Sequence, residues 1–127
     1  MTLRLLLLPL LLLAATAPAA DLTLTGTFDW SNQPNQKHPL TATFTPDGPA
    51  KWKVVFHCAW NGKPVTFAGN VTGKLDGPGD FKGEATGAGK RTWVFRGQGS
   101  RTELSARHFE TTNGKEQSTG HLTLNLK

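Results

Sequence analysis

Hydrophobic and polar residues alternate along most of the chain after residue 20, which is the pattern of strands whose two faces meet different surroundings. In segment 21–30, Leu22, Leu24 and Phe28 fall at even positions, and threonines occupy odd positions between them. The same period of two returns in 40–45, 52–60, 81–85, 93–97, 104–106 and 122–126. Helical periodicity is hard to find after residue 21, so the pattern predicts an all-β domain.

Clusters of glycine, proline and asparagine separate the alternating segments and predict the turns. They stand at 46–49, 76–80 and 87–89, while the polar segment Ser31–His38 predicts a longer loop. Asn61-Gly62 predicts a two-residue type I′ turn, in which both residues need positive φ. That turn pairs Trp60 with Lys63. It places Trp52, Val54, Phe56 and Cys58 on one face, together with the residues opposite them on the second strand.

The last hairpin is built around Asn113-Gly114. A two-residue loop there would set inward residues against outward ones. We therefore expect a three-residue loop, Thr112-Asn113-Gly114, with Leu104 opposite Leu122.

The sequence thus predicts an antiparallel meander of about eight strands, each with one apolar face and no helix to cover it. A sheet of this kind must close on itself or stack on a second sheet. Short sequential connections favour a small up-and-down barrel, and the alternative is a two-sheet β-sandwich.

One segment resembles a known family. Leu24-Thr25-Gly26-Thr27-Phe28 is similar to the opening strand of avidin-type barrels, which are exported and eight-stranded. The resemblance covers that segment only. It implies a barrel and transfers no ligand-binding residue, because the chain contains no tyrosine.

The N-terminus has the features of a cleavable signal peptide. Arg4 is followed by the apolar run Leu5–Leu13 and by Ala17-Pro18-Ala19, whose small residues suit a signal peptidase. We predict a signal peptide over 1–19, cleaved after Ala19 or Ala20, and a single domain over 20–127. The run is too short to span a bilayer, so a secreted or periplasmic protein with no transmembrane segment is expected.

Charge and cysteine content exclude few functions. The net charge of +5 includes Arg4, and the mild basicity that remains favours loose attraction to anionic surfaces. Cys58 is the only cysteine, so no intrachain disulfide forms. Its inward position predicts a small, unreactive core residue, because burial among apolar groups suppresses thiolate formation.

Aromatic residues supply the main candidate site. The apolar register contains Trp30, Trp52, Trp60 and Trp93. They either fill the core or line a pocket for a small apolar ligand, since an eight-stranded barrel is wide enough for one or the other. On the pocket interpretation, Trp52, Trp60, Lys63 and Trp93 are the predicted ligand-binding residues, and Lys63 would meet an acidic group of the ligand.

The sequence offers no catalytic or cofactor signature. His38, His57, His108 and His121 lack metal-ligand spacing, so no metal site and no cofactor are expected. His57 and His121 are predicted to face outward and His108 inward. No catalytic residue is assigned.

Basic residues on the outer face are the last feature of interest. Lys82, Arg96 and Arg107 project outward from successive strands, with Glu84 and Glu103 on the same face. Ordinary cross-strand charge pairing explains such a pattern, and a stripe that binds a polyanion is the alternative. Nucleic-acid binding is not expected, because such modules usually interleave exposed aromatic residues with the charge.

Three functions follow as hypotheses. The first is a non-catalytic interaction module of the envelope or extracellular space, which meets an anionic polymer through its outer face or rim. The second is a carrier of a small apolar ligand in an aromatic-lined barrel interior. The third is an enzyme, motivated only by the histidines and Asp29, and we expect the protein not to be one.

Overall fold

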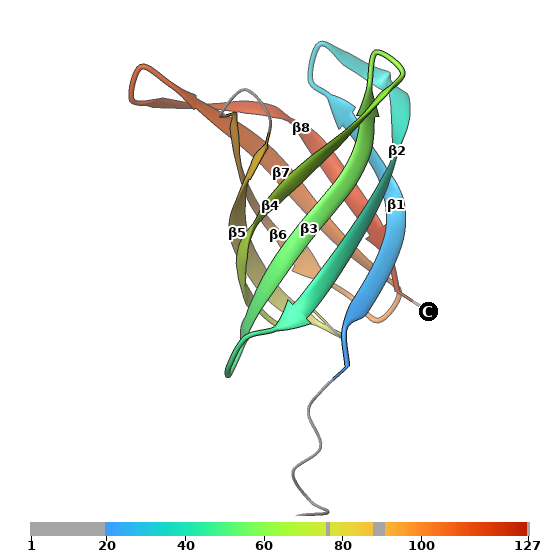
Figure 1. The fold of residues 1–127 in the computed structure, drawn as a ribbon, viewed down its shortest axis with the longest axis vertical. Coiled ribbons are helices and arrows are strands. Elements are labelled where there is room, and N and C mark those ends of the chain that lie inside the picture. Colours follow the sequence, from blue (N-terminus) through green and yellow to red (C-terminus); the bar gives the residue numbers. More distant parts are fainter. Residues whose placement is uncertain (1–19, 76, 88–90, 127) are drawn as a thin grey trace, which may run out of the picture.

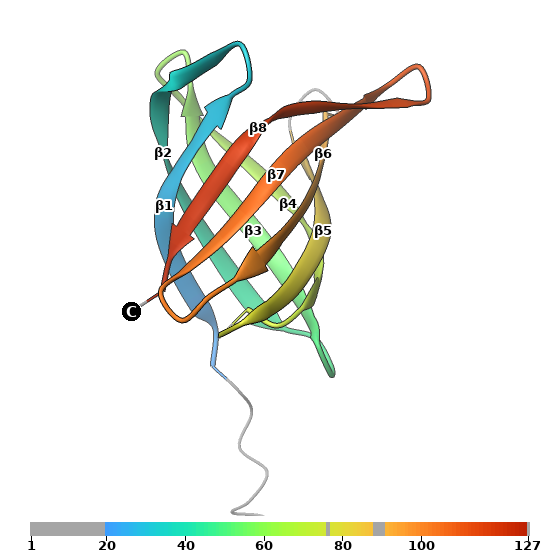
Figure 2. The ribbon, with the colours of Figure 1, turned by 180° about the vertical axis from the view of Figure 1, so that it is seen from behind.

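The structure, a computed structural model, describes residues 20–75, 77–87 and 91–126. These residues form eight strands: β1 (Leu22–Trp30), β2 (Gln33–Pro46), β3 (Lys51–Trp60), β4 (Lys63–Gly73), β5 (Gly79–Gly87), β6 (Thr92–Gly99), β7 (Glu103–Thr112) and β8 (Lys115–Asn125). Each strand is antiparallel to the next and β8 pairs with β1, so the sheet closes into a barrel (Figures 1 and 2). The all-β meander and the barrel are confirmed, and the sandwich alternative is wrong.

The predicted signal peptide, residues 1–19, lies outside the described residues. In the part of the chain that the structure describes, no helix is long and apolar enough to cross a membrane.

The β3–β4 hairpin has the register that its turn predicts. Trp60 is opposite Lys63, and the pairing continues without a shift to Lys51 and Thr72. Asn61 and Gly62 both have positive φ, at 51° and 75°. The turn sequence therefore decides which side chains of both strands enter the barrel.

The β7–β8 hairpin corrects the predicted three-residue loop. Asn113 and Gly114 have positive φ, and Thr112 pairs with Lys115, so the loop has two residues. A two-residue loop alone would pair inward residues of β7 with outward residues of β8. A register shift between His108 and Phe109 corrects this pairing. One extra residue on β8 at this bulge, Thr119, returns the apolar side chains to the interior.

The bulge also changes the predicted pairing on the core side of it. Leu104 lies opposite Leu124, and Ala106 lies opposite Leu122.

The polar segment Ser31–His38 is a strand rather than the predicted loop. Only residues 31 and 32 form the turn, and β2 begins at Gln33. Trp30 pairs with Gln33, and the β1–β2 register shifts between Phe28 and Trp30. The polar composition of the segment is explained by its position at the barrel rim, where both faces meet water.

The interior is filled over most of its length. Phe56 packs edge-on against Phe95, with ring centroids 5.3 Å apart, and against Phe44 at 6.3 Å. Leu75, from the β4–β5 connection, is fully buried. Trp52 packs against this core, and its Nε1 donates to the Gly73 carbonyl at 3.1 Å. We call this the closed end; it carries the β2–β3, β4–β5 and β6–β7 connections (Figure 1).

Gly120, beside the bulge, has a φ of 154° and lies against the wall of β1. A Cβ atom there would overlap the Asp29 carbonyl oxygen and come within 2.8 Å of the His108 ring. Gly120→Ala is expected to lower the free energy of unfolding by about 3 kcal/mol, the sum of backbone strain and overpacking.

Urea denaturation measures that loss, with Gly62→Ala as the control. Gly62 also has positive φ but has open space around it, so its substitution costs about 1 kcal/mol. Equal losses in the two variants contradict the close approach of β8 to β1.

Candidate functional site

The candidate site is a pocket at the end of the barrel opposite the closed end. This end, which we call the mouth, carries the β1–β2, β3–β4 and β7–β8 turns. The pocket has a volume of about 1010 Å³. It is lined by residues of β1, β2, β3, β7 and β8, of the β1–β2 and β3–β4 turns, and by Arg91 just before β6. Volumes near this value suit a small organic molecule.

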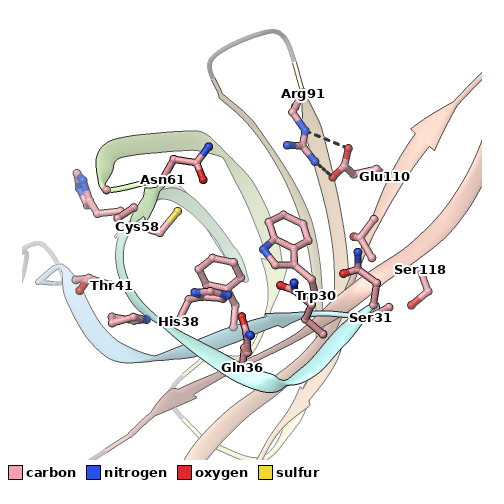
Figure 3. Close-up of a pocket in the computed structure, with 18 residues that line it drawn as sticks. Trp30, Ser31, Gln36, His38, Thr41, Cys58, Asn61, Arg91, Glu110 and Ser118 are labelled. Atoms are coloured by element: carbon pink, nitrogen blue, oxygen red, sulfur yellow. Dashed lines mark hydrogen bonds and ion pairs between the residues drawn. The ribbon is translucent and has the colours of Figure 1, made fainter.

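Trp30 stands at the centre of the mouth pocket (Figure 3). Its ring meets Phe28 edge-on at 5.6 Å between centroids, and it meets Trp93 at 5.8 Å and His108 at 5.6 Å in the same manner. Trp30 is half-buried, while the three rings that it covers are buried. It therefore forms the boundary between the filled core and the pocket.

An ion pair lies on the rim above Trp30. The Arg91 guanidinium donates to both carboxylate oxygens of Glu110, with its Nε 3.2 Å from Oε2. The Arg91 guanidinium carbon is also 5.7 Å from the centroid of the Trp30 ring. Charge at the rim is thus held in a fixed position beside an aromatic face (Figure 3).

The pocket also opens through the barrel wall between β2 and β3. Their pairing ends at Thr41 and His57, although β2 extends back to Gln33 and β3 extends on to Trp60. Residues on both sides of this gap line the pocket, among them Pro39 and Ala59. Proline has no N–H to donate to a neighbouring strand, which is consistent with the ladder ending beside it.

Two buried ring nitrogens near the pocket have no hydrogen-bond partner among the residues that the structure describes. One is Nε2 of His38, which lines the pocket, and the other is Nε1 of Trp93 directly behind it. Both rings contact Phe28, with centroids 5.2 Å and 5.7 Å away. An unsatisfied buried polar atom costs about 1–3 kcal/mol, so its presence needs an explanation.

Asp29 anchors the rim on the outer side of the wall. Its side chain is only 5% exposed, although the alternation placed it on the wet face. One carboxylate oxygen accepts from Lys37 Nζ at 2.6 Å, and the other accepts from the His121 backbone N–H at 3.0 Å. Burial alone would raise the pKa of Asp29, but these hydrogen bonds and the charge of Lys37 outweigh it and leave the pKa below its ordinary value of 3.8.

His108 lies inside the barrel, as predicted, and is fully buried. Its Nε2 is 2.8 Å from the Asp29 carbonyl oxygen, which can only accept, so Nε2 carries the proton. Its Nδ1 is 2.7 Å from the Thr119 hydroxyl. Burial lowers the pKa of His108 below its ordinary value of 6.5, and the contact with Asp29 offsets this only in part. The neutral ring stacks on Trp93 at 5.0 Å.

Three of the four predicted ligand-binding residues lie in different parts of the barrel. Trp52 is at the closed end, Lys63 is exposed at the start of β4, and Trp93 is fully buried, stacked on Phe67 at 4.4 Å. The side chain of Trp60 lies outside the described residues. Trp52, Lys63 and Trp93 do not line the mouth pocket, so their role in ligand binding stays a prediction.

Sequence reasoning missed the residues that do line the pocket. His38 fell in a segment expected to be a loop, and the Arg91–Glu110 pair joins residues whose distance in sequence hides their contact. Trp30 carried a usable signal, because it is the last aromatic residue of its strand on the inward face.

Cys58 also lies at the mouth rather than deep in the core. It is half-buried, packs against the core and lines the pocket. Burial raises the pKa of the Cys58 thiol and keeps it protonated. In the described part of the chain, no three His, Cys, Asp or Glu residues gather to hold a metal ion.

Comparison with known proteins gives the fold only. No protein-family model matches the chain, and no curated protein matches its sequence. Solved structures do match. The redesigned β-barrel b11L5F_LGL superposes with a TM-score of 0.66 at 18% identity, covering 83% of this chain and 89% of its own.

Two further designed barrels are similar. One, described as a de novo design of a fluorescence-activating β-barrel, has a TM-score of 0.56 at 16% identity and covers 87% of this chain and 94% of its own. The other, EF1p2_mFAP2b, solved bound to DFHBI, has a TM-score of 0.58 at 16% identity and covers 83% and 91%. At these identities the likeness shows the barrel and nothing of the function.

The Asp29 contacts predict a pH-dependent contribution to stability. Asp29→Asn loses the charged hydrogen bond from Lys37 and is expected to lower the free energy of unfolding by about 2 kcal/mol at pH 7. Because the folded pKa is depressed, this contribution is present above the unfolded pKa and is lost as the pH falls through the folded pKa. The difference between wild type and variant in urea denaturation should therefore shrink below about pH 4. Asp47→Asn, in an exposed turn, is the control and should change little.

His108 predicts a second loss of stability with falling pH, in a higher pH range than that of Asp29. Its folded pKa is lowered, so between that pKa and about 6.5 the unfolded chain binds a proton that the barrel does not. The free energy of unfolding should fall as the pH drops below about 6.5. His108→Gln should flatten this fall in denaturation series between about pH 7.5 and about pH 5, whereas His57→Gln, at an exposed position, should not. A fall that is the same in all three proteins contradicts the assignment.

Proposed function

We propose that this protein is a binding protein that holds a small, planar, largely apolar molecule in its mouth pocket. The observation that carries the proposal is a pocket of about 1010 Å³ with aromatic walls and a buried nitrogen, Nε2 of His38, that has no partner within the described part of the chain. Sites for small organic ligands combine apolar walls with a few placed polar groups in this way.

The chemistry of the lining describes the ligand. The faces of Phe28 and Trp30 favour a flat ring system. A polar atom of the ligand would satisfy His38 Nε2, which removes the cost of leaving that nitrogen dry. The gap between β2 and β3 gives a substituent of the ligand a route to the solvent.

Binding is better supported than catalysis. Both ring nitrogens of His108 lie at hydrogen-bond distance from protein oxygens, and the Cys58 thiol is kept protonated by its raised pKa. A general base or a nucleophile at either position would need the opposite arrangement. The similar designed barrels, one described as fluorescence-activating and one as bound to DFHBI, support the capacity of this fold to hold a small molecule.

The proposal includes an exported location. It rests on residues 1–19, which have the basic start, apolar run and small residues of a cleavable signal peptide. A fusion of residues 1–20 to a reporter enzyme that is active only after export tests it, and retention of the reporter in the cytoplasm contradicts it.

Two dyes test the mouth pocket. The probes are 1-anilinonaphthalene-8-sulfonate and its uncharged relative N-phenyl-1-naphthylamine. Each should bind saturably to one site with a rise in fluorescence. Trp30→Ala removes an aromatic wall and should weaken binding at least about tenfold, equivalent to about 1.4 kcal/mol.

Trp52→Phe is the matched control, since it changes a tryptophan at the closed end. It should leave dye affinity unchanged, and thermal denaturation checks that both variants are folded. The absence of saturable binding of either dye, or an equal loss in both variants, contradicts a ligand site at the mouth.

A further inference from the structure

A second binding feature lies on the outer wall, away from the mouth pocket. Lys82 of β5 is directly opposite Arg96 of β6, Arg96 is opposite Arg107 of β7, and Arg107 is opposite His121 of β8. All four side chains are exposed. We call them the basic row. The sequence predicted that all four face outward, and the register now shows that they are immediate cross-strand neighbours.

The basic row is not explained by stability. Like charges directly opposite each other destabilise a sheet, and here Arg96 has a cation on each side. Among the described residues, neither Lys82 nor Arg107 forms an ion pair with an acidic side chain. The two positions on either side of Arg96 thus keep their positive charge available to a partner.

Arg96 at the centre of the row is held in place. Its Nη1 and Nη2 lie 3.2 Å and 2.7 Å from the two carboxylate oxygens of Glu116. The guanidinium carbon is also 4.1 Å from the centroid of the Phe109 ring, and Arg107 reaches the same ring at 5.5 Å. The side chains around Phe109 are therefore ordered before any partner arrives, which reduces the entropy lost on binding.

A shallow groove of about 380 Å³ coincides with one end of the row. It is lined by Lys82, Arg96, Glu84, Asn70, Thr72 and Val94. The lining combines two cations, a carboxylate, an amide, a hydroxyl and an apolar side chain. A carboxylate and an amide in the groove accept hydrogen bonds from hydroxyl groups, whereas the carboxylate repels a purely anionic chain.

The curvature of the wall limits the shape of the partner. From Lys82 to His121 the row crosses three of the eight steps around the closed barrel. A flat surface, such as a membrane, cannot touch both ends of an arc of this length. A flexible linear chain can follow it.

We infer that the basic row and its groove bind a linear acidic polysaccharide. Its anionic groups meet Lys82 and Arg107 on either side of the ion-paired Arg96. Its hydroxyl groups meet Glu84 and the other polar side chains of the groove, and its flexibility lets it follow the wall. This function uses a surface separate from the mouth pocket and does not depend on what that pocket holds.

The test measures binding of the full protein to immobilised polygalacturonate at several salt concentrations. Lys82→Gln combined with Arg107→Gln should weaken binding at least about tenfold, equivalent to about 1.4 kcal/mol, and should make it less sensitive to salt. Lys63→Gln combined with Lys115→Gln removes the same charge at two exposed turn-proximal positions of the mouth and is the matched control. An equal loss in both double variants overturns the inference, because general basicity would then explain the binding.

Glu84→Gln separates a polysaccharide from a simple polyanion. Loss of the carboxylate should weaken binding to polygalacturonate about threefold, equivalent to about 0.7 kcal/mol, because hydroxyl groups lose a charged acceptor. The same variant should bind polyphosphate more tightly, since a repulsion is removed. Tighter binding of polygalacturonate by this variant overturns the inference.

Two further comparisons complete the test. Wild-type binding to polyphosphate, or to phosphatidylglycerol vesicles, that matches binding to polygalacturonate also overturns the inference. Trp30→Ala should leave polysaccharide binding unchanged, so failure of the proposed ligand site and failure of the basic row remain distinguishable.

Discussion

Closure of the sheet is the constraint from which the rest of the structure follows. Once β8 pairs with β1, every inward side chain is enclosed by eight strands, and each strand must keep its alternation in step with two neighbours. The β7–β8 turn alone would break this rule, and the extra residue Thr119 restores it. The bulge in turn brings Gly120, Asp29 and His108 together, so the polar contacts of the rim are a product of barrel closure.

The two ends of the barrel differ because their connections differ. At the closed end, Leu75 and Trp52 turn inward and complete the core. At the mouth, the hairpin turns extend past the last layer of core residues, and Trp30 is left as the boundary. The pairing of β2 with β3 stops early at the same end. The barrel interior is therefore fully covered at the closed end and only partly covered at the mouth. The pocket lies at the mouth.

The sequence predicts those features of the fold that depend on residues close together along the chain. The period of two and the turn at Asn61-Gly62 were enough for the class, the barrel and one full hairpin register. It does not predict contacts made by closure between distant residues. The burial of Asp29 depends on Lys37 and on the backbone of β8, and the Arg91–Glu110 pair joins two hairpins. The site lies where such contacts gather, which explains why His38 and the Arg91–Glu110 pair were not predicted as part of it.

The pairing of the first strand with the last also sets the order in which the molecule can form. Local hairpins such as β3–β4 can pair as soon as they leave the ribosome, but the seam between residues 25–28 and 122–125 needs nearly the whole chain. Until residue 125 has been made, β1 has only one partner strand and the apolar interior remains open to water. A chain with this topology therefore exposes its apolar interior to water throughout its synthesis. Pairing of the last strand with the first closes the barrel and ends that exposure.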